Sequence, residues 1–274
     1  MATERTGAGD PDRTLALLWR AASAPEPTRR GPRPRHSVDT VVAAAVALAD
    51  EAGIEAVTMR AVADRLGVAP MSLYTYVPGR AELVDLMVDS VHLAMDRPRW
   101  RARSWRRRLA LVAEANRSMF TAHPWMADVA TLSRPPLGPG LMAKYEHELA
   151  ALDGTGLTEV ETDSALTFVL SFVQSHARAA QAAGRAREDS AMDDAAWWEA
   201  NAPLLARALD EEAYPRAVRV GAAAGAAQSS AYSPEHAWEF GLTAALDGLA
   251  ALVARREPGR RRGVSAGGAG PGRQ

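Results

Sequence analysis

Helical periodicity is the feature that most restricts how this chain can fold. Apolar residues recur every three or four positions along most of its 274 residues, and no segment alternates apolar and polar residues between turns as a strand would. The helical segments are expected at 10–24, 37–52, 58–66, 69–76, 80–95, 104–122, 124–132, 140–152, 158–183, 195–209 and 233–255. The sequence therefore predicts an all-α fold.

Composition excludes several other classes of protein. Apolar residues make up 47% of the chain, charged residues 24%, and there is no cysteine, which is unlike a disordered chain or a disulfide-rich scaffold. The longest uncharged stretches, 164–177 and 220–234, are shorter than the roughly 20 residues that a membrane span needs. The first residues do not form an apolar signal segment. We therefore expect a cytoplasmic protein without a membrane partner.

Charge is distributed unevenly along the chain. The net charge of -1 combines acidic stretches, -5 over 37–95 and -10 over 109–254, with basic ones. The basic stretches are 1–36 with +3, 96–108 with +6 and 255–274 with +5. A basic arm and tail on an acidic body favour contact with a polyanion at defined places over a generally basic surface.

Residues 58–77 have the spacing of a helix-turn-helix. This motif needs a small residue where its helices cross, a glycine with positive φ in the turn, and an apolar anchor on the second helix, which Ala63, Gly67 and Leu73 supply. With Leu73 pointing inward, its neighbours project outward, where a recognition helix meets base edges in the major groove. A pair of ordinary bundle helices is the alternative, but it would not place large apolar side chains on the polar face.

From residue 37 to 83 the sequence resembles the tetracycline-repressor (TetR) family of bacterial regulators. The matching motifs are ADEAGI (49–54), VTMR (57–60), VADRLGV (62–68), LYTYV (73–77) and RAEL (80–83). The second half is similar to the branch named after the tetracycline repressor, through HPW (123–125) and RPPLGP (134–139). The resemblance implies a homodimer that binds a palindromic, double-stranded DNA operator and leaves it when a small-molecule inducer binds the larger domain.

The resemblance also assigns DNA contacts to particular residues. They are Thr58, Arg60, Pro70, Met71, Ser72, Tyr74, Thr75, Tyr76 and Arg80. Because this region is acidic, attraction to phosphate must come from elsewhere. Helix N-termini can supply backbone N–H groups, and Arg33 and Arg35 of the N-terminal arm can enter an adjacent minor groove. A solvated linker is the alternative for the arm.

Two helical segments, 158–183 and 233–255, carry small residues at every fourth position or nearly so. The positions are Thr167, Ser171, Ser175, Ala179, Ala237, Gly241, Ala245 and Gly248. Such ridges allow close approach of a second helix, and two helices per subunit would form a four-helix bundle with their copies, which is how the family dimerises. Close packing inside one subunit is the alternative.

The family holds its inducer in a mostly apolar cavity of the larger domain. Candidate lining residues are His92, Phe120, Trp125, Met126, Tyr145, Phe168, Phe172, His176, Trp197 and Trp198. Ordinary core packing is the alternative for each of them. Ala130 falls where a metal-bound inducer would require a histidine, so we expect neither a metal nor another cofactor. The identity of the inducer is not predicted.

Four segments are expected. They are an arm with a possible extra helix (1–36), a helix-turn-helix domain (37–84), a ligand-binding and dimerisation domain (85–255) and a disordered basic tail (256–274). The leading interpretation is a ligand-released repressor. A DNA-binding activator, or a regulator without a ligand, has the same sequence features. An all-α enzyme is disfavoured because the sequence contains no nucleophile elbow, metal-ligand spacing or phosphate loop.

Overall fold

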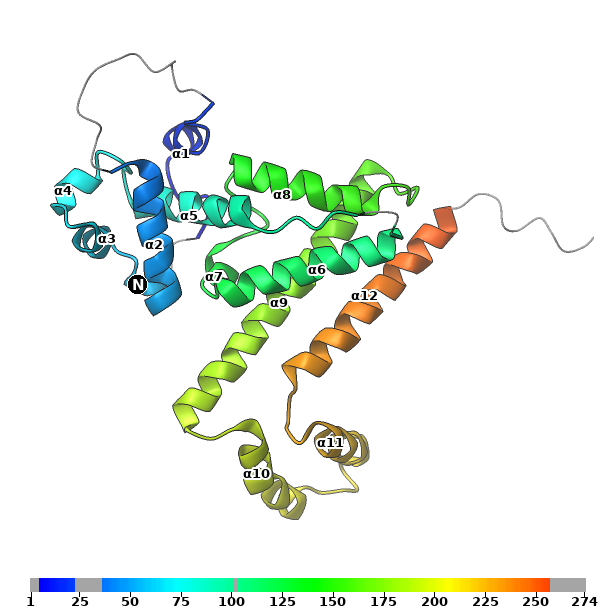
Figure 1. Cartoon of the computed structure of the whole chain (residues 1–274). Helices are drawn as coiled ribbons and strands as arrows, with labels where there is room; N and C mark the ends of the chain where they lie inside the picture. The colour runs from blue at the N-terminus through cyan, green and yellow to red at the C-terminus, as the bar shows by residue number, and fades with distance from the viewer. Residues whose placement is uncertain (1–4, 23–35, 101–102, 257–274) are drawn as a thin grey trace, which may run out of the picture.

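The computed structural model describes residues 5–22, 36–100 and 103–256, and within them every regular element is a helix, which confirms the all-α prediction (Figure 1). The first half contains α1 (Pro11–Leu18), α2 (Val38–Ala52), η1 (Ile54–Ala56), α3 (Met59–Leu66), α4 (Pro70–Leu73) and α5 (Arg80–Ala94). The second half contains α6 (Trp105–Ala122), α7 (Met126–Val129), α8 (Pro139–Leu149), η2 (Ala150–Leu152), α9 (Glu159–Ser190), α10 (Asp194–Ala208), α11 (Pro215–Gln228) and α12 (Pro234–Arg256). The predicted tail lies almost wholly outside the described residues.

Local signals in the sequence account for α2 and α3 of the helix-turn-helix region. The side chain of Ser37 caps α2 by accepting a hydrogen bond from the backbone N–H of Thr40, at 3.2 Å, and Thr58 caps α3 in the same way through Ala61, at 3.0 Å. Gly67 ends α3 in the left-handed conformation with φ of 66°. These caps fix where each helix begins and ends.

Helix α5 connects the helix-turn-helix region to the rest of the molecule. It starts just after α4 and runs between α2 and α8, with α1 against its first turns (Figure 1). Its apolar side chains Leu83, Val84, Met87 and Val88 are fully buried. The helix is therefore in contact with both halves of the protein.

The second half is built around the long helices α9 and α12, with α6 packed against both (Figure 1). Ion pairs join the elements, such as Arg117 of α6 with Glu235 of α12. By length and composition alone α12 could cross a membrane, with a mean hydropathy of 1.3. In the structure one side of α12 packs inside the protein through Trp238 and Leu249, so core packing explains part of its apolar character.

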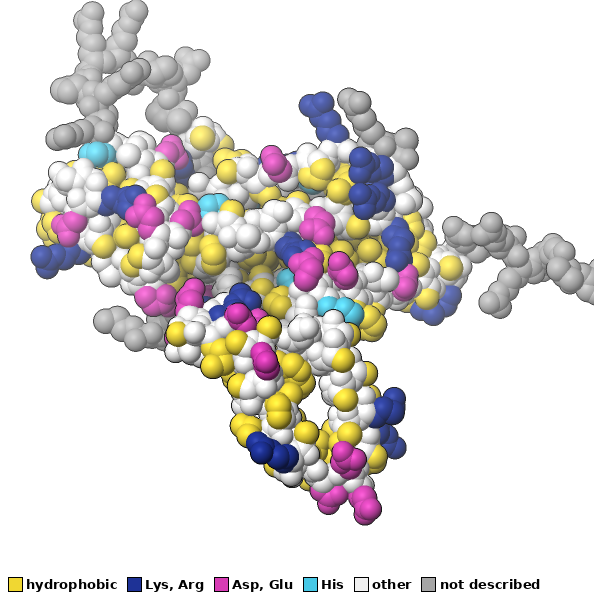
Figure 2. All heavy atoms as spheres, turned by 60° about the horizontal axis from the view of Figure 1, so that its bottom comes forward, with side chains coloured by type: hydrophobic (Ala, Val, Ile, Leu, Met, Phe, Trp, Pro, Cys, Tyr) yellow, Lys and Arg dark blue, Asp and Glu magenta, His cyan; other side chains and the backbone are white. Residues whose placement is uncertain are grey.

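Helices α10 and α11 form an arm that projects from the bundle, and the sequence did not predict α11 (Figure 1). No helix was assigned between 209 and 233 from the sequence. Gly225 explains the difference: a Cβ there would collide with the ring of Trp198, so the glycine lets α11 lie against α10. No residue of α10 is buried, and Figure 2 shows hydrophobic side chains on the surface of this arm.

Candidate DNA-binding surface and ligand cavity

The second helix of the helix-turn-helix exposes the side chains that could contact DNA. Leu73 is 0% exposed and anchors α4 in the core, whereas Met71 is 77% exposed and Tyr74 46%. Seven of the nine predicted contact residues are exposed: Thr58, Arg60, Pro70, Met71, Ser72, Tyr74 and Thr75. Exposure around one anchored helix is what insertion into a major groove requires.

The other two predicted contact residues lie deeper. Tyr76 is half-buried, and the Arg80 guanidinium donates hydrogen bonds to the backbone carbonyls of Val57, at 2.7 Å, and Ile54, at 2.9 Å. Arg80 therefore holds the start of α5 against the loop before α3, a structural role that the sequence did not reveal. Arg33 and Arg35 lie outside the described residues.

Not all of the acidic residues of this region face the solvent. Glu82, Asp85 and Asp89 are buried in α5. The Asp50 carboxylate accepts a hydrogen bond from the indole N–H of Trp125, at 2.7 Å, and Glu51 pairs with Arg65, at 2.6 Å. The hydrogen bond from Arg65 lowers the pKa of Glu51. Part of the negative charge of this region is thus directed inward, whereas Asp39, Glu55 and Asp64 stay exposed.

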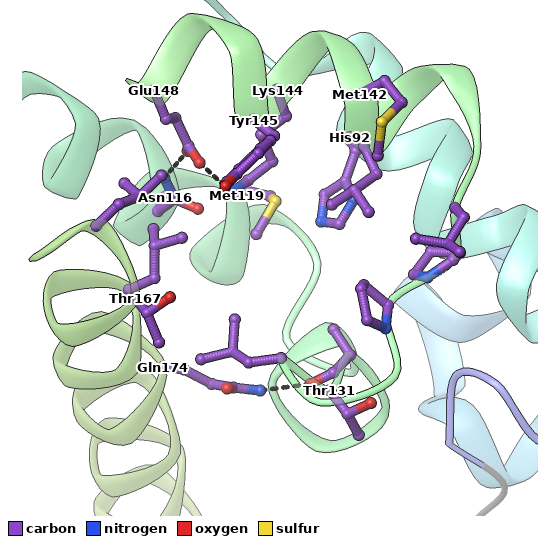
Figure 3. Close-up of a pocket in the computed structure, with 18 of the residues that line it drawn as sticks. His92, Asn116, Met119, Thr131, Met142, Lys144, Tyr145, Glu148, Thr167 and Gln174 are labelled. Atoms are coloured by element: carbon purple, nitrogen blue, oxygen red, sulfur yellow. Dashed lines mark hydrogen bonds and ion pairs between the residues drawn. The ribbon is translucent and has the colours of Figure 1, made fainter. Parts of the chain in front are cut away.

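A cavity of about 300 Å³ lies between α5, α6, α8 and α9 (Figure 3). Its walls are mostly apolar, and the loop 130–137 closes one side. Three of the predicted ligand residues line it, namely His92, Phe120 and Tyr145, and Thr167, which was expected at the dimer face, lines it as well. A mainly apolar cavity with a few polar groups is the usual form of a small-molecule site.

The other seven predicted ligand residues lie outside this cavity. Trp125 bonds to Asp50 of α2, and Met126 is core. The rings of Phe172 and His176 pack against Trp238, with centroids 5.5 Å and 5.0 Å away, and so fill the space between α9 and α12. The remaining three are Phe168, which is exposed beside α12, and Trp197 and Trp198, which are on the projecting arm. Aromatic character alone did not separate core, surface and cavity.

The small residues predicted for the dimer face also lie in different environments. A side chain at Gly241 would collide with Phe172 of the same subunit, and Ala245 is buried, so these two positions serve internal packing. Ser171, Ser175 and Gly248 are exposed, whereas Ala179 and Ala237 are half-buried.

The polar end of the cavity was missed by the sequence analysis. The ammonium group of Lys144 pairs with the Glu148 carboxylate at 2.7 Å, and the Asn116 side chain donates to the same carboxylate at 2.6 Å (Figure 3). Lys144 is the only lysine in the chain, and its charged partner follows at four residues on a helix. That pairing is common on exposed helices, so it gave no sign of burial.

His92 is a neutral side chain at this end of the cavity. Burial lowers its pKa to about 3, helped by the positive charges of Lys144 and Arg97. Its Nδ1 atom is buried and has no hydrogen-bond partner. Because the ring is uncharged at neutral pH, one nitrogen carries a proton and the other can accept one.

The walls of the cavity are attached directly to α5. The Asp89 carboxylate accepts hydrogen bonds from the backbone N–H groups of Gly140, at 3.1 Å, and Leu141, at 2.8 Å, at the start of α8. A Cβ at Gly140 would collide with the backbone of Asp89, so the two helices touch there. Movement of the cavity residues on α8 therefore acts on α5.

Residues 5–20, which we call the N-terminal strap, form a second connection. Thr6 donates its backbone N–H to the carbonyl of Val129 at 3.0 Å, and the indole of Trp19 donates to the carbonyl of Leu137 at 2.7 Å. On the other side, Gly7 donates to the Asp85 carboxylate at 2.9 Å. The strap thus joins the loop that closes the cavity to the first turns of α5.

The Asp85 carboxyl should make stability depend on pH. Burial raises its pKa to about 6, although the hydrogen bond from Gly7 opposes the shift. The ordinary value of about 4 applies to the unfolded chain, so the group favours the folded state below pH about 4 and loses that contribution as pH rises through about 6. We expect Asp85→Asn, which can still accept from Gly7, to raise the unfolding free energy at pH about 8 by about 1 to 2 kcal/mol. Urea unfolding at several pH values measures this, and a variant less stable than the parent at pH about 8 would contradict it.

Comparison with known proteins agrees with this architecture. A family model described as "Bacterial regulatory proteins, tetR family" matches residues 41–87, and one described as "Tetracyclin repressor-like, C-terminal domain" matches residues 97–253. The HTH-type transcriptional repressor DrrR1 of Streptomyces coeruleorubidus is 38% identical over 93% of this chain and 91% of its own.

Solved structures show the same fold. ActR of Streptomyces coelicolor, in complex with actinorhodin, has a TM-score of 0.67 and 27% identity, covering 79% of this chain and 96% of ActR. The complex of ActR with (S)-DNPA has a TM-score of 0.64 and 27% identity, covering 80% and 98%. The exposed recognition helix, the two family models and the long match to a repressor together show that this chain belongs to the TetR family of DNA-binding transcription regulators.

Proposed function

We propose that the protein is a cytoplasmic, homodimeric repressor, without enzymatic activity, that leaves its operator when a small molecule fills the cavity. The observation that carries this is the direct attachment of the cavity wall to α5, the helix that begins just after the recognition helix. Support comes from relatives, since DrrR1 is named a repressor and ActR is solved with two small molecules.

The seven exposed residues around α3 and α4 are proposed to contact the operator, together with Arg33 and Arg35 in the minor groove. A two-fold dimer presents two such surfaces, so the operator is expected to be palindromic. A ligand that shifts α8 would move α5 and change the separation of the two recognition helices. Loss of simultaneous engagement then releases the DNA.

Footprinting tests this function directly. The full chain is mixed with the DNA upstream of its own gene, and a protected palindrome is expected. Addition of a compound library that includes actinorhodin should then remove the protection for at least one member. Transcription in vitro separates the alternatives: an activator raises transcript from the footprinted promoter, and a regulator without a ligand stays bound throughout. The absence of any protected palindrome would contradict the DNA-binding part of the proposal.

The proposed dimer face is the exposed side of α9 and α12. Ser171 and Ser175 lie there on α9, and Phe240 of α12 is 71% exposed. A groove next to them is lined by Phe168, Gly248 and Leu252, among other residues. Large apolar side chains in water next to small residues are typical of a face that packs against another helix pair.

Ser175→Arg should convert the dimer to monomer. The substitution places a charge in both copies of the face, and a charge buried without a partner costs several kcal/mol. Leu15→Arg, at an exposed apolar position on α1, is the matched control and should stay dimeric. Sedimentation velocity distinguishes the two states; an unchanged dimer for Ser175→Arg would place the interface elsewhere.

Trp19→Phe should weaken the coupling between cavity and operator. The change removes the N–H donor to Leu137 but keeps an aromatic ring. One hydrogen bond contributes about 1 kcal/mol, so the factor by which saturating ligand weakens operator binding should fall about fivefold, while binding without ligand stays the same. The factor is measured by operator titrations with and without a library compound that removes the footprint. Trp197→Phe on α10 is the control, and an equal factor in both variants would contradict the role of the strap.

A further inference from the structure

The imidazole of His92 lines the polar end of the cavity. The residue is 6% exposed, and Figure 3 shows its ring directed into the hollow below α8. Nδ1 is buried without a partner. Leaving a buried polar group unpaired costs about 1 to 3 kcal/mol, and native structures rarely tolerate it without a reason. Because Nδ1 is closed off by the protein, a ligand in the cavity would reach the imidazole at its other ring nitrogen, Nε2.

Charges at this end of the cavity already compensate each other. Lys144 and Glu148 form an ion pair at 2.7 Å, and Asn116 satisfies the second carboxylate oxygen. His92 adds no charge because its pKa is held at about 3. A charged ligand group placed here would lose its hydration without gaining a free counter-ion, which is costly. The part of the ligand that enters this end is therefore uncharged.

The cavity walls favour a flat ring. Met119 and Met142 present polarisable thioethers, and Phe120, Pro135 and Pro136 add broad apolar surfaces. Methionine sulfur and aromatic faces both contact aromatic rings favourably. For the polar group, a hydroxyl can donate or accept, so it matches Nε2 in either tautomer of the neutral imidazole, whereas a carbonyl matches Nε2 only when that nitrogen carries the proton.

We propose that the cavity takes an aromatic compound that is uncharged at the polar end of the cavity and whose hydroxyl group hydrogen-bonds there to Nε2 of His92. The inference rests on the proposed function in that the cavity is taken as the ligand site. It adds a chemical class of ligand and makes His92 the residue that selects for the hydroxyl.

A pair of probes tests the proposal without DNA. Naphthol and methylnaphthalene, substituted at the same ring position, differ only by a hydroxyl and a methyl group of similar size. Their dissociation constants are measured by fluorescence titration on the full-length parent, on His92→Phe and on His176→Phe. His176 is the matched control because it is a buried histidine outside the cavity, packed on Trp238. The titration contains no operator, so it tests this inference independently of DNA binding. A protein that binds naphthol but no DNA would contradict the proposed function and leave this inference standing.

The parent should bind naphthol more tightly than methylnaphthalene. His92→Phe should lower that preference about tenfold, the effect of one hydrogen bond of about 1.4 kcal/mol, and His176→Phe should keep it. Thermal melting checks that each variant folds, and His92→Leu replaces His92→Phe if the larger ring is not accommodated. A parent that prefers methylnaphthalene, a preference that survives both His92 substitutions, or binding of neither probe would each overturn the proposal.

Discussion

Tyr74→Ala should strongly weaken specific operator binding while leaving the protein folded. Tyr74 is 46% exposed beside the recognition helix, whereas the neighbouring anchor Leu73 is 0% exposed. Removal of one base-edge or phosphate contact costs about 1 to 3 kcal/mol, and the dimer loses it in both half-sites. The combined effect is a loss of about 30-fold to more than 1,000-fold in operator affinity. Electrophoretic mobility shift on the footprinted operator measures it, and thermal melting should show little change.

Tyr214→Ala is the matched control for this prediction. Tyr214 is 56% exposed, but it directly precedes α11 on the projecting arm, far from α4 (Figure 1). The control should bind the operator as the parent does. Parent-like operator binding by Tyr74→Ala, or a large fall in its melting temperature, would show that the side chain does not act as a DNA contact.

The helix-turn-helix could be predicted from the sequence because its determinants are local. Thr58 caps α3 by accepting a hydrogen bond from the backbone N–H of Ala61, three residues further along the chain. Gly67 adopts a left-handed conformation that few other residues tolerate. Leu73 needs only to be apolar at the correct position on a short helix. Each determinant acts over a few residues, so a reading of single residues and their spacing is sufficient.

The cavity depends on contacts between distant segments, and these were not predictable in the same way. Phe120 lines it, but Phe172, equally aromatic, packs on Trp238 because Gly241 leaves room for its ring. The sequence shows which residues are apolar but not which helices lie opposite them. Seven of the ten candidates therefore fell outside the cavity.

The strap illustrates a further limit. A short helix at 10–24 was expected, and α1 is there, yet its contacts with α5 and with the cavity loop involve backbone groups. Each of these hydrogen bonds has a backbone group at one end and joins residues more than 70 positions apart, so the spacing of side chains along the sequence does not reveal it. From the sequence, acidic residues such as Asp85 were counted as negative charge that repels DNA. In the structure the Asp85 carboxylate accepts a hydrogen bond from Gly7 and so holds the strap.

The buried ion pair predicts the largest change in stability. Lys144 is 7% exposed and Glu148 2%, so Lys144→Met would leave the Glu148 carboxylate buried with only the amide of Asn116 as a partner. Removal of one member of a buried pair costs about 3 to 5 kcal/mol, since the remaining charge is uncompensated. Urea unfolding of the variant should show a loss of this size.

The double variant separates the cost of the lone charge from the loss of the pair itself. In Lys144→Met with Glu148→Gln, the glutamine oxygen still accepts the hydrogen bond from Asn116, and no charge remains buried. Replacement of a whole buried pair by uncharged groups is often neutral or stabilising, so we expect the double variant to recover most of the lost free energy. A double variant as unstable as Lys144→Met would mean that the packing of the lysine stem, and not the unpaired carboxylate, sets the stability at this end of the cavity. A single variant as stable as the parent would show that water reaches Glu148, in which case the polar end of the cavity is open to solvent and a charged ligand could enter it.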